Sequence, residues 1–411
     1  MLKRKTTIIA LVLVALCAVS CHESDQTTPS DEGAQRMIGF RASVEESDTR
    51  ATGDGELTTA LLKDRGFGVY CWYTGNADFT EPKPTSARTG STQPYLMLMR
   101  NQKVTWNATV WDYSPKKYWP QDPTEKLTFR AYAPYTDYLL TDATTGMPQL
   151  PVVVTKDDYH NGTQHDPLWG TGRLDTDDKY GNHYDNVTYT SSSHRTTPDA
   201  TDDNTTDGYI HWYFHHGMSK LVFKAKLSDE APNDERIKIT AIKLEPLYTR
   251  GLLNLSSPAT QASDKPIWTD CNGSDEDMKG MSALTLSLDT DTPANSDLND
   301  VFISKPADPT TPAEPVDVAK EGLLIIPRTF PTTDPLVITV YYQREGDTTV
   351  YEAQAKLPDT AADPQATSRD FFGNTAYTIT LNINPVTKYF TITINVNLFW
   401  QVGSYKLIDE L

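Results

Sequence analysis

The run YFTITINVNLFW, residues 389–400, indicates the fold class more clearly than any other stretch of the chain. Successive side chains of an extended chain point to opposite sides, so this run has one polar and one apolar side. β-branched residues occur on both sides, which favours a strand over a helix. We predict a half-buried strand that either closes this protein's own sheet or completes the sheet of a neighbouring copy. Its apolar row is Phe390, Ile392, Ile394, Val396 and Leu398.

The rest of the chain, from residue 60 onward, has the same character. Short apolar or alternating runs are separated by Gly, Pro, Asn and Asp, with no long amphipathic helical pattern. Many short strands with turn signals between them predict an all-β fold built of sandwiches. Besides the closing strand, the expected strands are 67–73, 104–113, 127–132, 209–215, 220–226, 236–244, 284–288, 323–326, 336–343, 350–355 and 377–383.

The length predicts two domains, because about 390 residues after removal of a signal are too many for one small core. We place the boundary around 251–266, which gives an N-terminal sandwich at 51–258 and a C-terminal sandwich at 259–411. Residues 157–207 form a tract rich in Asp, Thr, Ser, His and Tyr, which predicts a long polar insertion with little to bury. The Pro-rich segment 306–315 predicts a surface excursion outside any central strand.

The N-terminus has the composition of a secretory signal. Three basic residues precede an apolar run at 8–16 that is too short to span a bilayer, and small residues follow. The segment Ala18-Val19-Ser20-Cys21 resembles the bacterial lipobox, in which the signal is cut before a cysteine that carries acyl chains. We therefore predict a signal peptide at 1–20, cleavage between Ser20 and Cys21, and lipidation of Cys21. Two or more acyl chains suffice for stable anchoring. The alternative is an ordinary signal peptide cut near a chance cysteine.

A polar, acidic tether at 21–36 separates this signal from a second alternating run. Ile38, Phe40, Ala42 and Val44 share one side of that run, which predicts a strand. The next segment, 47–55, is small, polar and glycine-containing, as exposed loops that are open to proteolysis are. Within it, the Arg50-Ala51 bond is the feature that would attract a specific protease.

The composition excludes some classes of partner. A formal net charge of −18 makes nucleic acid an unlikely partner. The apolar share of 38% is low for a globular chain, which fits long polar loops. Apart from Cys17 and Cys21, only Cys71 and Cys271 remain, so there is no disulfide framework. These two cysteines form either a single bridge or two separate thiols.

Motifs of enzyme chemistry are missing from the sequence, so we predict a protein that is not an enzyme and needs no cofactor or metal. Residues 175–181 are similar to a calcium loop, but Tyr180 stands where the sharp turn needs glycine. His211, His215 and His216 are crowded, yet the first two share a side of a strand and the third faces the other way. This favours a core or edge role over a metal site.

Two further features allow a functional and a structural interpretation. Trp106, Trp111, Tyr113, Tyr118 and Trp119 either form a sugar-stacking platform or pack in the core, and core packing is favoured. Asp359-Thr360-Ala361 resembles an O-glycosylation sequon that Bacteroidetes use for exported proteins, which makes Thr360 a candidate glycosylation site.

A series of short motifs follows in order along the chain, at 49–51, 66–70, 118–120, 127–134, 166–169, 214–223, 323–327, 373–377, 394–396 and Trp400. This series resembles the fimbrillin family of Bacteroidales, the lipoprotein-derived pilus subunits. The resemblance covers nearly the whole chain after the signal, with departures at Arg328 and at the 157–207 insertion.

The resemblance implies two tandem transthyretin-like β-sandwiches and a role in cell adhesion. It implies a lipid-anchored precursor on the outer membrane surface, whose partners are other fimbrial subunits. An Arg-specific protease would cut after Arg50, the strand bearing Ile38, Phe40, Ala42 and Val44 would leave, and the row from Phe390 to Leu398 of another subunit would replace it. The alternative is a monomeric surface lipoprotein that binds glycans. The host or bacterial ligand cannot be read from the sequence.

Overall fold

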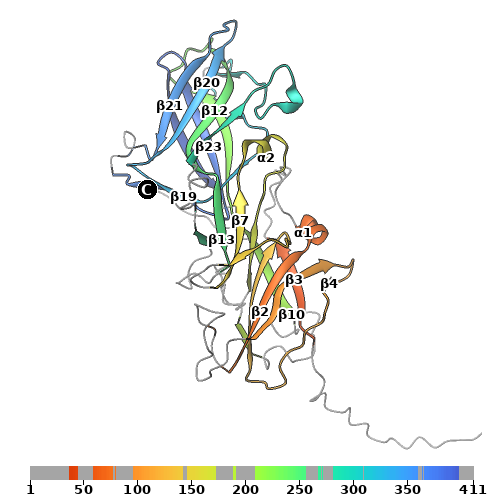
Figure 1. Ribbon diagram of the computed structural model, residues 1–411. Helices are drawn as coiled ribbons and strands as arrows, with labels where there is room; N and C mark the ends of the chain where they lie inside the picture. The colour runs from red at the N-terminus through yellow and green to blue at the C-terminus, as the bar shows by residue number, and fades with distance from the viewer. Residues whose placement is uncertain are drawn as a thin grey trace, which may run out of the picture. The chain divides into compact units, whose positions relative to one another are not determined.

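The computed structural model describes residues 37–44, 59–76, 79, 96–141, 146–172, 188–190, 209–255, 267–269, 271, 281–308, 310–359, 363 and 365–397. Nearly all regular elements in these residues are strands (Figure 1). The helical elements there are α1 (Thr59–Arg65), α2 (Lys156–His160) and a 3-10 turn at Pro293–Asn295. The all-β prediction is confirmed. No helix in the described part of the chain is long and apolar enough to cross a membrane.

The first sheet has eight strands, which are β1 (Gly39–Val44), β2 (Phe67–Gly75), β3 (Leu96–Trp106), β4 (Trp111–Asp112), β5 (Lys126–Ala133), β8 (Leu168–Gly172), β9 (Thr188–Thr190) and β10 (Tyr209–His216). Their order is β2-β3-β4-β1-β10-β8-β5-β9, and β2 also pairs with β5. This extra pairing closes the sheet on itself, which leaves few free edges. Side chains from β1, β2, β5 and β10 share one hydrophobic cluster, called here the first core.

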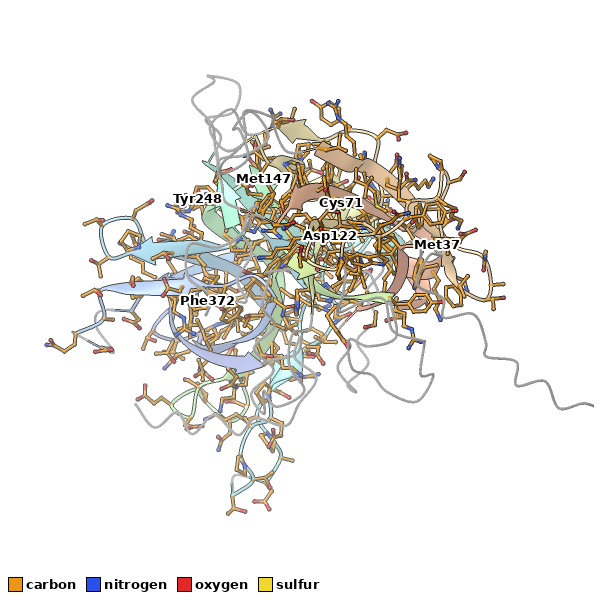
Figure 2. The ribbon with its side chains drawn as sticks, turned by 90° about the horizontal axis from the view of Figure 1, so that it is seen from below. Met37, Cys71, Asp122, Met147, Tyr248 and Phe372 are labelled. Atoms are coloured by element: carbon orange, nitrogen blue, oxygen red, sulfur yellow. The ribbon has the colours of Figure 1, made fainter. Side chains whose placement is uncertain are left out.

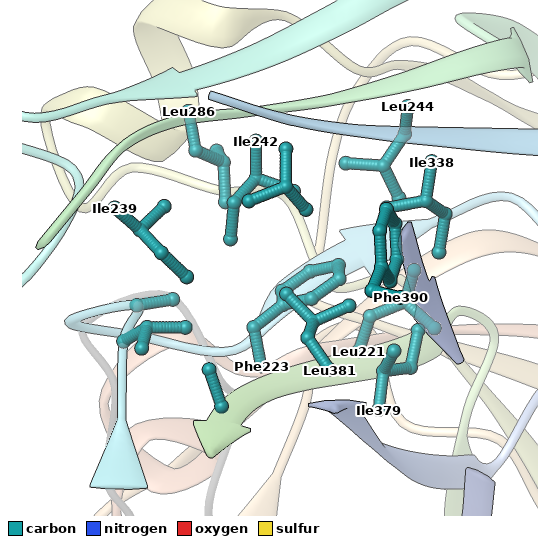
Figure 3. Close-up of a cluster of buried hydrophobic side chains, with 14 of the residues drawn as sticks. Leu221, Phe223, Ile239, Ile242, Leu244, Leu286, Ile338, Ile379, Leu381 and Phe390 are labelled. Carbon is teal, nitrogen blue, oxygen red and sulfur yellow. The ribbon is translucent and has the colours of Figure 1, made fainter. Parts of the chain in front are cut away.

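A second core lies between two further sheets. One contains β11 (Ser219–Leu227), β17 (Val316–Asp317), β18 (Leu323–Ile325), β23 (Thr375–Asn384) and β24 (Tyr389–Asn397), and the other contains β12 (Arg236–Tyr248), β15 (Met281–Ser287), β16 (Ile303–Ser304), β20 (Leu336–Arg344) and β21 (Tyr351–Leu357). Every second residue of β11 faces this core and is buried. Figure 3 shows the two layers meeting through side chains such as Leu221, Ile242, Ile338 and Phe390.

Two small sheets complete the fold. The larger one has the order β14 (Ile267–Thr269), β13 (Arg250–Asn254), β7 (Pro148–Val153) and β6 (Leu140–Thr141). The smaller one pairs β19 (Arg328–Pro331) with β22 (Ser368–Phe371). Trp268 of β14 donates its indole N–H to the carbonyl of Gly217 at 3.0 Å. This hydrogen bond links the four-stranded sheet to the segment that joins β10 to β11.

The chain passes from the first sheet to the second core at Gly217-Met218. β10 pairs with β1 and β8, whereas β11 pairs with β23. The predicted boundary around 251–266 therefore does not coincide with the change of sheets, because residues 219–248 pair with strands that follow residue 280. The sequence separates the predicted strands 209–215 and 220–226, but it does not indicate that the chain changes sheets between them. A Cβ at Gly217 would lie 2.7 Å from the Pro167 carbonyl oxygen, so this close connection needs glycine.

The predicted strand 104–113 is interrupted in the structure. Residues 104–113 were expected to be continuous, but β3 ends at Trp106 and β4 begins at Trp111. The side chain of Asn107 accepts hydrogen bonds from the backbone N–H groups of Thr109 at 3.1 Å and Val110 at 2.9 Å. Ala108 has a φ of 75°. An Asx turn therefore interrupts the apolar run.

The prediction that residues 157–207 have little to bury is wrong for the first part of this tract. Most of α2 and all of β8 lie in it, and Tyr159 packs in the second core with 4% of its surface exposed. Thr155 caps α2 by accepting from the N–H of Asp158. Residues 173–187 and 191–207 lie outside the described residues. In the Pro-rich segment, the described residues 306–308 and 310–315 contain no strand, as predicted.

Candidate functional site

β1, the first strand of the described chain, is enclosed on both sides. It pairs in parallel with β10 along its whole length, from Gly39 opposite Tyr209 to Val44 opposite Phe214. On its other side it pairs with β4 in antiparallel fashion at Phe40 and Trp111. A strand in this position satisfies the backbone groups of two neighbours, so its loss would leave both with unpaired N–H and C=O groups.

The apolar row predicted for β1 faces the first core. Ile38, Phe40 and Val44 are 0%, 2% and 5% exposed, and Ala42 is half-buried against the same cluster. Full burial of such a side chain contributes about 1.5–3 kcal/mol. Burial of this row therefore stabilises β1 in the sheet in addition to its hydrogen bonds.

Phe40 is the centre of an aromatic cluster. Its ring lies 6.1 Å from Phe67 and 6.3 Å from Phe129, both edge to face, and 5.4 Å from Tyr113. These partners come from β2, from β5 and from the residue after β4. Such ring pairs add about 0.5–1.5 kcal/mol beyond their burial. Removal of β1 would thus uncover an aromatic pocket as well as two strand edges.

The start of β1 is fixed by the segment that follows β4. The Ile38 N–H donates to the Lys117 carbonyl at 2.9 Å, and the Tyr113 hydroxyl donates to the Ile38 carbonyl at 2.7 Å. Met37 forms an isolated bridge with Tyr118. Burial raises the pKa of Tyr113 to about 12, so its hydroxyl stays protonated and able to donate at neutral pH.

The end of β1 is held by α1. The Val44 N–H donates to the Thr59 hydroxyl at 3.1 Å, and this hydroxyl contacts the Val44 carbonyl at 3.4 Å. Thr59 is the first residue of α1. The predicted cleavage site, Arg50-Ala51, lies between these two elements but outside the described residues. Sequence reasoning missed Tyr113 and Thr59 because both act on β1 from distant positions in the chain.

Replacing Tyr113 with Phe should lower the free energy of unfolding by about 1 kcal/mol, the usual net value of one buried hydrogen bond. The ring would stay against Phe40, but the Ile38 carbonyl would lose its donor. Urea unfolding followed by circular dichroism measures this. Tyr118→Phe is the matched control, since Tyr118 is 45% exposed. An equal loss in both variants, or none in Tyr113→Phe, would contradict the role given to this hydroxyl.

Cys71 lies in the same core as β1. It is fully buried, and burial raises the pKa of its thiol well above the usual value. Lys117 and Tyr113, the two residues that hold Ile38, are among its electrostatic neighbours. Cys271 is half-buried, and both cysteines are free. Of the two predicted alternatives, the structure therefore has separate thiols. Figure 2 marks Cys71 within the packed side chains and Met37 at the start of the described chain.

β24, the closing strand, lies on this protein's own sheet. It pairs with β23 in antiparallel fashion from Tyr389 opposite Asn384 to Asn397 opposite Ala376. It is also the last strand of its sheet, so in the described part of the chain no strand covers its outer edge. The sequence left open whether this strand closes its own sheet, and in the structure it does.

The two sides of β24 differ in burial as the alternation predicts. Phe390 is 1% exposed and lies in the second core (Figure 3). Ile392 and Ile394 are half-buried against the same core. Thr391 and Thr393 are exposed. The end of the predicted row at Leu398 lies outside the described residues, as do Ser20, Cys21 and Thr360. β1 and β24 belong to different sheets and do not pair with each other in this chain.

Two of the crowded histidines, His215 and His216, are buried beside other polar side chains. His215 and His216 are 1% and 2% exposed. His216 Nδ1 lies 2.6 Å from Asp166 Oδ2, and the Asn374 side chain lies 3.4 Å from His215 Nδ1. The described residues contain no group of three potential metal ligands from His, Cys, Asp and Glu. The calcium-like run 175–181 lies outside them.

The aromatic residues at 106–119 are chiefly core residues. Trp111, Tyr113 and Trp119 are 7%, 5% and 2% exposed, and Trp106 is half-buried. Tyr118 is exposed. Core packing, the favoured interpretation, is confirmed for the three buried rings, and one exposed tyrosine does not make a stacking platform.

The closed first sheet, the two-layered second core and the enclosed first strand together define an all-β fold of packed sheets. A family model described as fimbrillin-like matches residues 49–397. The chain belongs to this fimbrillin-like family.

Two similar proteins are also described as fimbrial proteins. The fimbrium subunit Fim1C of Phocaeicola vulgatus is 26% identical over 269 residues, which span 63% of this chain and 61% of that relative. The crystal structure of a fimbrial protein from Bacteroides vulgatus matches with a TM-score of 0.54 and 20% identity over 89% of this chain and all of that one. At this identity, the likeness to the solved structure shows the fold alone.

Proposed function

We propose that the protein is a structural subunit of a fimbrium, made as a lipoprotein precursor and assembled by protease-triggered exchange of a strand. Signal cleavage before Cys21 and acylation of this residue would anchor the precursor at the outer membrane surface. Cleavage after Arg50 would release β1, and a strand of another subunit would take its place. The assembled fimbrium would serve adhesion to a surface that is not yet identified. The two cores correspond in this proposal to two transthyretin-like sandwiches.

The observation that carries this proposal is the position of β1. The strand precedes a stretch containing a single arginine, and that stretch separates β1 from α1. A cut there turns β1 from a covalently attached strand into part of a separate peptide. The effective concentration that kept it in its sheet is then lost, so a strand from another molecule can compete for the same place.

A competing strand needs an apolar row at alternate positions and free backbone groups. β24 has both, because its apolar row alternates and its outer edge is unpaired among the described strands. When the two rows are aligned in the same direction, Phe390, Ile392, Ile394 and Val396 take the places of Ile38, Phe40, Ala42 and Val44. Three of the four incoming side chains are then Phe or Ile, and Leu398 would extend the row.

Cys71 offers a direct test, because it lies in the core that β1 covers. Iodoacetamide should modify Cys71 slowly in the uncleaved chain and rapidly in cleaved subunits that have lost β1. Modification should become slow again once the subunits assemble, since a replacing strand buries the thiol anew. Peptide mass mapping follows each cysteine separately, and Cys271 serves as the internal control.

Two results would refute this proposal. The first is slow modification of Cys71 in cleaved subunits from which the peptide ending at Arg50 has been removed. The second is modification of Cys71 in filaments as fast as in cleaved monomers. Labelling of Cys271 should remain constant throughout, which guards against general unfolding as the cause of a change.

The alternative is a monomeric surface lipoprotein that binds glycans. It differs from the fimbrial proposal in the fate of residues 37–50. A monomeric binding protein would keep its first strand and would not form ladders or filaments after treatment with an Arg-specific protease. Burial of Trp111, Tyr113 and Trp119 weighs against the aromatic platform that first suggested this alternative.

A further inference from the structure

The outer side of the β11-β23-β24 sheet carries a pocket that the strand-exchange proposal does not use. Its volume is about 400 Å³, within the range of roughly 300–1,000 Å³ that small-molecule sites occupy. Neighbouring strands supply its floor, with Lys226 from β11, Thr380 and Asn382 from β23, and Thr391 and Thr393 from β24. These residues alternate with the apolar ones that fill the second core, so they face away from it.

The lining is almost entirely polar. Ser228, Asp229 and Asn395 complete it, and Pro315 is its one apolar member. Most small-molecule sites are chiefly apolar with a few polar groups. A pocket of hydroxyls and amides instead suits a ligand that itself carries many hydroxyl groups, because each buried polar atom then finds a hydrogen-bonding partner.

Two polar groups of the pocket lining lack a partner among the described residues. Lys226 has no ion pair or hydrogen bond with any part of the described chain, whereas Lys224, two residues earlier on the same side of β11, pairs with Asp317 at 3.0 Å. The Asn382 amide donates to the Thr393 hydroxyl at 3.1 Å, and its Oδ1 has no hydrogen-bond partner among the described residues. The lining thus contains a lysine ammonium without an ion pair and an amide oxygen without a hydrogen-bond donor among the described residues.

From this arrangement we propose that the pocket binds an acidic sugar. The Lys226 ammonium would hold the carboxylate, and the threonine hydroxyls, Asn382 and Asn395 would bind the sugar hydroxyls. Asp229, the one carboxylate in the lining, is exposed and would accept hydrogen bonds from sugar hydroxyls. A peptide strand is a poorer occupant, because it would add to a sheet edge and this pocket lies on a sheet face. Nucleic acid is disfavoured by the net charge of −18.

The pocket exists as described only while β24 lies on its own sheet, since Thr391, Thr393 and Asn395 belong to its lining. The uncleaved chain is therefore the protein to test. The proposal does not depend on strand exchange, so its success or failure is separate from that of the fimbrial proposal.

Isothermal titration of the uncleaved chain with N-acetylneuraminic acid, glucuronic acid and galactose tests the site. At least one acidic sugar should bind, and galactose should bind at least fivefold more weakly than that sugar. Lys226→Ala should weaken acidic-sugar binding at least fivefold, and Thr393→Val, which replaces a hydroxyl with a methyl group, should weaken it at least twofold. Lys224→Ala is the matched control and should bind as the parent chain does. Circular dichroism checks that each variant is folded.

Failure of both acidic sugars to bind would overturn the proposal. So would equal affinities of Lys226→Ala and the parent chain, or an equal loss in Lys224→Ala. Galactose binding as tightly as the acidic sugars would overturn the role of the lysine and with it the class of ligand.

Discussion

Replacing Arg50 with Ala should keep the protein monomeric under conditions in which the parent chain assembles completely. The proposed assembly begins only when the Arg50-Ala51 bond is cut, because β1 otherwise stays in its sheet by covalent attachment. In the intact chain, Ile38 and the β1 residues Phe40 and Val44 are buried, and β1 has a neighbour on each edge. The measurement is incubation with an Arg-specific protease, followed by size-exclusion chromatography with light scattering and by gel electrophoresis without boiling.

Arg41→Ala is the matched control for this prediction. Arg41 lies in β1 itself, with its guanidinium over the Tyr209 ring, so the variant removes an arginine from the strand and leaves the Arg50-Ala51 bond intact. It should still be cleaved and still assemble. Filaments from Arg50→Ala at the parent rate would contradict the proposed trigger.

Replacing Ile392 and Ile394 together with Asp should abolish assembly while leaving a folded monomer. In the aligned rows these side chains take the places of Phe40 and Ala42, so two carboxylates would enter an apolar, aromatic environment without partners. Burying an unpaired charge costs far more than a strand gains from its remaining contacts. Filament yield after cleavage measures the effect on assembly.

The monomer should survive this change because both residues are only half-buried at the edge of their own sheet. The free energy of unfolding should fall by about 1 kcal/mol for each, roughly half the value of a fully buried side chain. Thr391→Asp/Thr393→Asp is the matched control, since these residues are exposed on the opposite side of β24. It should assemble normally. Assembly by the isoleucine variant, or failure of the threonine variant alone, would exclude β24 as the donated strand.

Alternation along the chain was enough to predict the fold class and both strands of the candidate site. Phe40 and Phe390 face cores because period-2 patterning directly encodes which side of a strand is buried. The change of sheets at Gly217-Met218 was not predictable in this way. In the sequence, β10 and β11 are two consecutive apolar runs. The contact of Gly217 with Pro167, which fixes the connection between them, joins positions that are distant in the sequence.

Three other features of the structure were also not predicted from the sequence. Tyr159 lies in a polar tract, yet it packs in the second core and donates to the Glu321 carbonyl at 3.0 Å. Asn107 breaks an apolar run through a local side-chain bond that hydrophobic patterning ignores. The polar pocket escaped prediction because Lys226, Asn382 and Thr393 meet only through strand pairing. Tertiary contacts thus decided the burial of Tyr159 and the formation of the pocket, whereas a local turn decided the break at Asn107.

The central claim is that β1 is removed by a cut after Arg50 before the subunit assembles. N-terminal sequencing of the protein taken from purified filaments tests this most directly. The account predicts that the filament form begins at Ala51 and that residues 37–50 are missing from it. Filaments whose subunits begin upstream of Ile38 and retain Phe40 would contradict it.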